Sequence, residues 1–148
     1  MKLEELKVLV PNVEYKQMEY QENRKIEILF TGEYMGYRFY ILNLGTHPTA
    51  YIEIPEGHDL FGKHYDDINI DVHGGLTYAE DHLRGVKENS WFIGWDYAHA
   101  GDYGGYDVKW IGTKLYGEED KKWTTEEIFD DVVNVIEQIR DGGYYESN

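Results

Sequence analysis

Hydrophobic and polar positions alternate in several short stretches, a pattern typical of strands with one face in a core. Gly and Pro residues punctuate the chain between these stretches, as at Gly45 and Pro48. The alternation is most regular over residues 68–73, where Ile68 and Ile70 share one face. The pattern predicts strands at residues 25–30, 37–42, 50–54, 68–73 and 91–95.

The last apolar pattern has a helical period and covers residues 124–140. Thr124 and Glu127 have the spacing of a capping box, and Gly142 favours the end of the helix. One face of this helix is apolar and needs a partner, which the apolar face of a sheet provides. The sequence therefore predicts an α+β fold: a mostly antiparallel or mixed sheet of about five strands, with a C-terminal amphipathic helix packed on one face.

The length of 148 residues indicates a single domain over residues 1–148. Residues 1–23 are polar and mixed, which favours a loose N-terminal segment with a short edge strand near Val8, Val10 and Val13. Residues 56–67 are predicted to form a polar loop with room for one helical turn. Residues 106–122 show no interpretable pattern.

The charge and composition of the chain limit the classes of partner that it can bind and the chemistry that it can perform. Twenty-nine acidic and fourteen basic residues give a net charge of −15, which argues against direct binding to nucleic acid or to an anionic membrane. The chain has no cysteine, which excludes disulfides and thiolate chemistry. The sequence shows no signal peptide and no apolar stretch of membrane-spanning length, so we expect a cytoplasmic protein.

Two short motifs hold most of the residue types that bind polar ligands. The first covers residues 71–78 and the second residues 95–102. Their carboxylates, imidazoles, hydroxyls and glycine amides suit a small polar ligand, and an aromatic ring can stack on a planar one. The candidate ligand-binding residues are Asp71, His73, Gly74, Gly75, Thr77, Tyr78, Trp95, Asp96, His99 and Asp102.

A divalent metal ion is a possible cofactor, because carboxylate oxygens and imidazole nitrogens are its common ligands. The candidate metal ligands are Asp71, His73, Asp96, His99 and Asp102. Their spacing matches no metalloprotease, deaminase or EF-hand motif. An aspartate beside a histidine is also often a structural pair, and an aspartate in a glycine-rich loop often caps backbone amides.

The segments DVHGGLTY, at residues 71–78, and GWDYAHAGD, at residues 94–102, are the most distinctive of the chain. Together with the rest of residues 51–102, they resemble a family of uncharacterised proteins of phages, prophages and bacterial genomes. Members of that family often carry a cysteine at the position of Tyr97, so a cysteine-dependent function would not transfer to this chain. The resemblance implies an accessory protein of a mobile element, which would block a host protein or capture a host nucleotide signal.

Three functions agree with these features. The first is binding of a small polar, nucleotide-like ligand, as a counter-defence protein that sequesters a host signal. The second is metal-dependent hydrolysis of a phosphodiester or nucleotide, with His73, Asp96 and Asp102 holding the ion and His99 or Asp71 as the general base. The third is inhibition, in which the acidic chain occupies a basic surface of a host defence enzyme.

Overall fold

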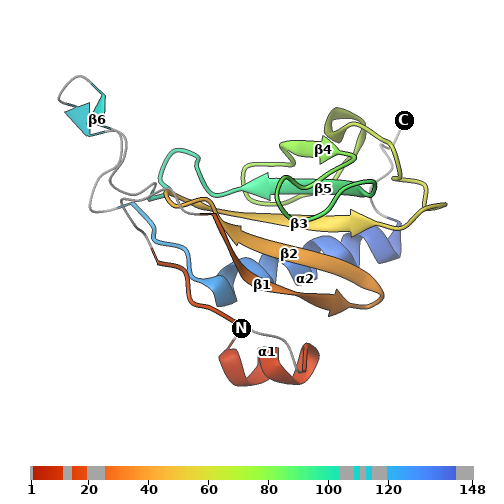
Figure 1. Cartoon of the computed structure of the whole chain (residues 1–148), viewed down its shortest axis with the longest axis horizontal. Coiled ribbons are helices and arrows are strands. Elements are labelled where there is room, and N and C mark those ends of the chain that lie inside the picture. Colours follow the sequence, from red (N-terminus) through yellow and green to blue (C-terminus); the bar gives the residue numbers. More distant parts are fainter. Residues whose placement is uncertain are drawn as a thin grey trace.

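An antiparallel sheet of five strands forms the centre of the computed structural model, which describes residues 2–11, 15–19, 26–103, 109–110, 113–114 and 120–142. The strands lie in the order β1-β2-β3-β5-β4 (Figure 1). The predicted α+β class is confirmed. The strands are β1 (Glu27–Tyr34), β2 (Tyr37–Asn43), β3 (Pro48–Ile54), β4 (Tyr78–Glu80) and β5 (Trp91–Asp96).

The remaining elements of the described residues are two helices, one 3-10 turn and a two-stranded antiparallel pair. They are α1 (Leu3–Leu9), η1 (Tyr65–Asp67), α2 (Thr125–Asp141) and the two-residue strands β6 (Lys109–Trp110) and β7 (Thr113–Lys114). The turn η1 is the one helical turn expected in the loop of residues 56–67. Among the described residues, no helix combines the length and apolar character that crossing a bilayer requires.

Helix α2 packs against one face of the sheet, where it contacts β1, β2 and β3. Phe129 lies at the centre of this contact, with its ring centroid 5.1 Å from that of Phe30 and 5.2 Å from that of Phe39. Each apolar side chain buried here contributes about 1.5–3 kcal/mol. The buried stripe of the helix consists of Ile128, Phe129, Val132, Val135, Ile136 and Ile139.

The bounds of α2 follow from its caps. The Thr124 hydroxyl accepts the Glu127 N–H, and the Glu127 carboxylate accepts the Thr124 N–H, which completes the predicted capping box. Gly142 ends the helix in the left-handed conformation, at φ 71°. The prediction for residues 124–140 is confirmed within one residue at each end.

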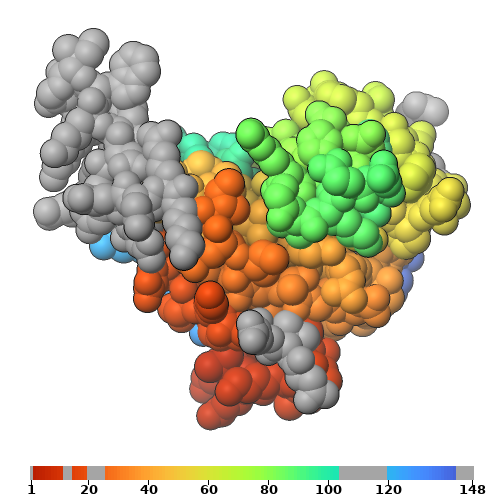
Figure 2. Space-filling view, viewed as in Figure 1, coloured from red at the N-terminus to blue at the C-terminus, as the bar shows by residue number. Residues whose placement is uncertain are grey.

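The opposite face of the sheet carries a second, smaller core. Tyr40, Leu42, Tyr51 and Phe92 pack there with Leu83. Leu83 belongs to the segment between β4 and β5, which stands over this face as the green mass of Figure 2.

One predicted strand is wrong. Residues 68–73 form no strand, although Ile68 and Ile70 are buried and Asn69 between them is exposed, as the alternation indicated. The backbone of Asp71 pairs instead with the side chain of Gln138 on α2: its N–H donates to Oε1 at 2.9 Å, and its carbonyl accepts from Nε2 at 2.7 Å. The fifth strand of the sheet is instead β4, which pairs antiparallel with β5.

The N-terminal segment also differs from the prediction. Residues 3–9 form helix α1, and Leu6 and Val10 are buried in the main core, so an edge strand near Val8 and Val10 is wrong. The strand-like contact comes later, where Tyr15 forms an isolated antiparallel bridge with Phe30. Val13 and most of residues 106–119 lie outside the described residues.

Candidate functional site

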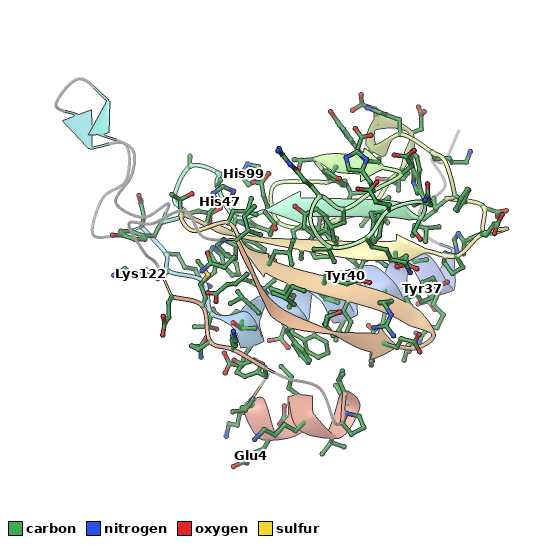
Figure 3. All side chains as sticks on the ribbon, in the orientation of Figure 1. Glu4, Tyr37, Tyr40, His47, His99 and Lys122 are labelled. Atoms are coloured by element: carbon green, nitrogen blue, oxygen red, sulfur yellow. The ribbon has the colours of Figure 1, made fainter. Side chains whose placement is uncertain are left out.

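The candidate site lies where β5 ends. Asp96 is the last residue of that strand and faces Thr49 of β3 in the sheet register. The chain stays against β3 for one more residue, because the Tyr97 N–H donates to the Pro48 carbonyl at 3.1 Å. Figure 3 shows His99 beyond the end of β5, on the same side of the molecule as His47, which precedes β3. The two sequence motifs meet at this end of the sheet, beyond the last residue of β5.

Asp102 is the centre of the site. Its side chain is buried, with 3% of its surface exposed, and it accepts three separate donors. His73 Nε2 lies 2.7 Å from Oδ2 and 3.0 Å from Oδ1. The Trp123 indole N–H donates to Oδ1 at 2.8 Å, and the His99 backbone N–H donates to Oδ2 at 3.0 Å.

These contacts decide the charge of Asp102. Burial acts to raise the pKa of its carboxyl, but the hydrogen bonds from His73, the His99 backbone and Trp123 outweigh it and lower the pKa below its usual value. Asp102 is therefore a carboxylate at neutral pH and accepts all of its hydrogen bonds. The nitrogen that faces it, His73 Nε2, must carry a hydrogen.

Aromatic rings fix the imidazole of His73. It stacks on Tyr97 with a centroid distance of 5.2 Å and an interplanar angle of 7°. Trp123 lies 4.8 Å from it at 53°, and His99 lies 5.6 Å from it at 74°. These contacts hold the ring in one orientation, and the side chain remains 28% exposed.

A second pair of histidine and aspartate lies beside the first. His99 Nε2 is 3.1 Å from Asp96 Oδ1, although the angles are not those of a hydrogen bond, and this nitrogen is buried without a hydrogen-bond partner in the described structure. The Thr77 hydroxyl donates to Asp96 Oδ2 at 3.1 Å, and the Ala98 N–H donates to Oδ1 at 3.1 Å. Asp96 thereby joins the first motif, through Thr77, to the second.

The two glycines of the first motif shape the turn. Gly74 has φ +69° and lies directly against the ring of His99. Gly75 has φ +76°, and its N–H donates to the Val72 carbonyl at 2.8 Å. The Gly75 amide is therefore engaged in the turn, which speaks against the ligand-binding role expected of this amide.

Four residues of the site were not predicted from the sequence. His47 comes from the break before β3; burial lowers the pKa of its imidazole, while Asp96 and Asp102 act to raise it and His99 acts to lower it. Its Nδ1 lies 3.0 Å from the Thr46 hydroxyl. The other three are Tyr97, Trp123 and Asp131.

Tyr97 connects the site to helix α2. Its hydroxyl donates to Asp131 Oδ2 at 2.6 Å and accepts the Trp95 indole N–H at 2.9 Å. Burial, and then the charge of Asp131, raise the pKa of the Tyr97 hydroxyl. Burial also raises the pKa of Asp131, against the hydrogen bond from Tyr97.

Three candidate residues lie elsewhere. Trp95 is 1% exposed and packs in the main core, so its ring cannot stack on a ligand. Asp71 is exposed, and its backbone contacts α2. The Tyr78 hydroxyl donates to the His82 carbonyl, and burial raises its pKa to about 12.

The five candidate metal ligands do not gather into one centre. Within the described residues, the group of three whose ligand atoms lie within 4.8 Å of one another is Glu80, Asp81 and His82, which follow one another in the chain. Two of them are exposed acids, a common arrangement without a metal ion. The geometry at the end of β5 is instead two adjacent histidine–aspartate pairs, His73 with Asp102 and His99 with Asp96.

The chain matches no protein-family model, no curated protein and no solved structure. The resemblance to phage and prophage proteins accordingly stays a prediction.

Proposed function

We propose that this protein binds a small polar, nucleotide-like ligand at the end of β5. The observation that carries the proposal is the meeting of the two motifs: His73 contacts Asp102, and Thr77 contacts Asp96. These residues are 29 and 19 positions apart in the chain. Neither contact is a local turn interaction, so the fold brings the two motifs together.

The chemistry of the site supports ligand binding. Burying the Asp102 carboxylate costs free energy, and three donors are needed to offset that cost. Charged groups held in this way are concentrated at functional sites. The partly exposed groups around it, His73, His99 and Thr77, offer donors and acceptors on a rigid support.

Charge indicates which part of a ligand lies beside the carboxylates of the site. The chain has a net charge of −15, and the site itself holds Asp96 and Asp102. The low pKa of His47 keeps that imidazole uncharged at neutral pH. This field favours the neutral, donor-bearing part of a ligand, such as a nucleobase, close to the carboxylates. In the setting that the sequence resemblance implies, such binding would sequester a host nucleotide signal.

The proposal is tested by calorimetry with AMP, cyclic AMP and cyclic di-AMP, beside native mass spectrometry of the protein as purified. We expect one of these ligands, or a copurified molecule of nucleotide mass, to bind the parent protein. His73→Ala and Asp96→Ala should remove binding while circular dichroism and the melting curve show a folded protein.

His82→Ala is the matched control. His82 also pairs with an aspartate, Asp81 Oδ1 at 3.0 Å, but outside the site. It should bind like the parent. The proposal is wrong if no nucleotide binds, or if the folded His73→Ala and Asp96→Ala proteins bind as tightly as the parent.

A further inference from the structure

The imidazoles of His73 and His99 lie side by side and each has a carboxylate near its Nε2, although only His73 is hydrogen-bonded to that carboxylate. Each turns Nε2 toward a carboxylate, at 2.7 Å from Asp102 Oδ2 for His73 and at 3.1 Å from Asp96 Oδ1 for His99. Among the described residues, neither Nδ1 takes part in a hydrogen bond. The side chains keep 28% and 33% of their surface exposed. Each ring therefore keeps one nitrogen for a ligand, and the ring centroids are 5.6 Å apart.

His73 has the form of a general base. The ionised, buried Asp102 requires a hydrogen on Nε2, so the lone pair of the neutral ring is on Nδ1. A carboxylate that fixes the tautomer of an imidazole and stabilises its protonated form is the arrangement of histidine bases in hydrolases. The stacking of Tyr97 and the contact with Trp123 hold the ring in place.

His99 can supply the acid. In its protonated form the ring has a hydrogen on both nitrogens; Nε2–H faces Asp96, and Nδ1–H is available for donation. The protonated ring also provides a positive charge, which an anionic substrate needs beside a chain of net charge −15. Two imidazoles side by side can thus take a proton at one point of a substrate and donate one at another.

We propose that His73 and His99 form an acid–base pair that hydrolyses a phosphodiester bond of the bound ligand without a metal ion. His73 Nδ1 takes a proton from water as the water oxygen forms a bond to phosphorus. The bond from phosphorus to the leaving oxygen breaks, and that oxygen receives the proton of His99 Nδ1. The products are a phosphomonoester and an alcohol, and proton exchange with solvent restores both histidines. The inference rests on the proposed function, because the substrate must occupy the same site.

The test uses the full chain in buffer containing EDTA, with two substrates that differ in their leaving group. Bis(4-nitrophenyl) phosphate releases 4-nitrophenolate, which needs no acid, whereas cyclic di-AMP releases an alkoxide, which does. We expect the parent protein to cleave both. His73→Gln should lower kcat by about 100-fold or more on both substrates. His99→Gln should give a comparable loss on cyclic di-AMP and a much smaller one on bis(4-nitrophenyl) phosphate.

Asp102 is a positioning residue in this scheme. Asp102→Asn should lower kcat while KM stays near the parent value, because the amide no longer fixes the tautomer of His73 but leaves the site in shape. His82→Gln is the control and should match the parent in both constants.

The inference is overturned if the parent cleaves neither substrate, if folded His73→Gln protein is as fast as the parent, or if EDTA removes the activity. Calorimetry separates the two proposals. Binding of cyclic di-AMP without cleavage overturns the acid–base pair and leaves the proposed function standing, whereas loss of both binding and cleavage overturns both.

Discussion

The imidazole of His99 occupies the space where a side chain at Gly74 would begin. A Cβ at position 74 would lie 2.1 Å from His99 Nε2, far inside contact distance. Gly75, the next residue, has nearly the same backbone conformation, but its Cβ would meet nothing within 4 Å. A substitution at Gly75 therefore meets backbone strain alone, whereas a substitution at Gly74 meets backbone strain and steric contact with His99.

Gly75→Ala should lower the free energy of unfolding by about 1 kcal/mol, the usual cost of a positive φ at alanine. Gly74→Ala should cost about 2–4 kcal/mol, because overpacking against His99 adds to the same strain. Urea unfolding of both variants measures the difference. Equal losses would show that His99 moves away from Gly74 without cost.

Asp102 should make the protein sensitive to acid. Its pKa is lowered in the folded state, so its contribution to stability is fully present above the unfolded value of about 3.9 and is lost as the pH falls through the folded value. Asp102→Asn should lower the free energy of unfolding by about 2–3 kcal/mol at pH 7, and by progressively less as the pH falls below about 3.9. Urea unfolding of both proteins at each pH measures this. A difference that does not change with pH would contradict the low pKa.

His47 should affect the stability of the protein in a higher pH range than Asp102 does. Burial lowers the pKa of its imidazole in the folded state, so the unfolded chain binds the proton more readily. Stability from this group is complete above about pH 6.5, its unfolded value, and falls as the pH drops below it. In His47→Gln, the curve of unfolding free energy against pH should be flatter between about pH 6.5 and 5. A nuclear magnetic resonance titration of His47 that gives a raised pKa would refute the prediction.

Tyr97→Phe should reduce stability more than the loss of one hydrogen bond. The variant leaves both the Trp95 indole N–H and the Asp131 carboxyl without their partner. We expect a loss of about 2–3 kcal/mol in the free energy of unfolding. A double-mutant cycle with Asp131→Asn should show coupling, with the double variant less destabilised than the sum of the two single variants. Additive losses would show that the two side chains act independently.

Sequence patterns correctly predicted an element whose bounds are set by residues of its own segment. Helix α2 carries its capping box at Thr124 and Glu127 and its terminating Gly142 within its own segment, so its bounds were close to those of the structure. Residues 68–73 show the limit of this reasoning. Alternation reports which side chains face a core, and it reported Ile68 and Ile70 correctly. It does not report the backbone partner, which is the side chain of Gln138, 67 positions away from Asp71.

The candidate site was also predicted only in part. His73, Thr77, Asp96, His99 and Asp102 stand in two conspicuous motifs, and the structure brings these motifs together. The residues that support them come from segments without a motif: His47 from a turn and Asp131 from the middle of α2. Trp95 stands in a motif but belongs to the core, because the side chains of β5 alternate between the two faces of the sheet.

The two outer strands of the sheet differ from those of aggregation-prone sheets. A long, open strand edge is a template on which another chain can add a strand. On the β1 side, Lys16 donates its N–H to the Leu29 carbonyl at 2.8 Å, and Tyr15 bridges Phe30. On the other side β4 has three residues, less than the usual strand length of about five or six. Among the described residues, β4 thus forms a short edge and β1 an edge that is partly covered at Leu29 and Phe30, and both features hinder the addition of a further strand.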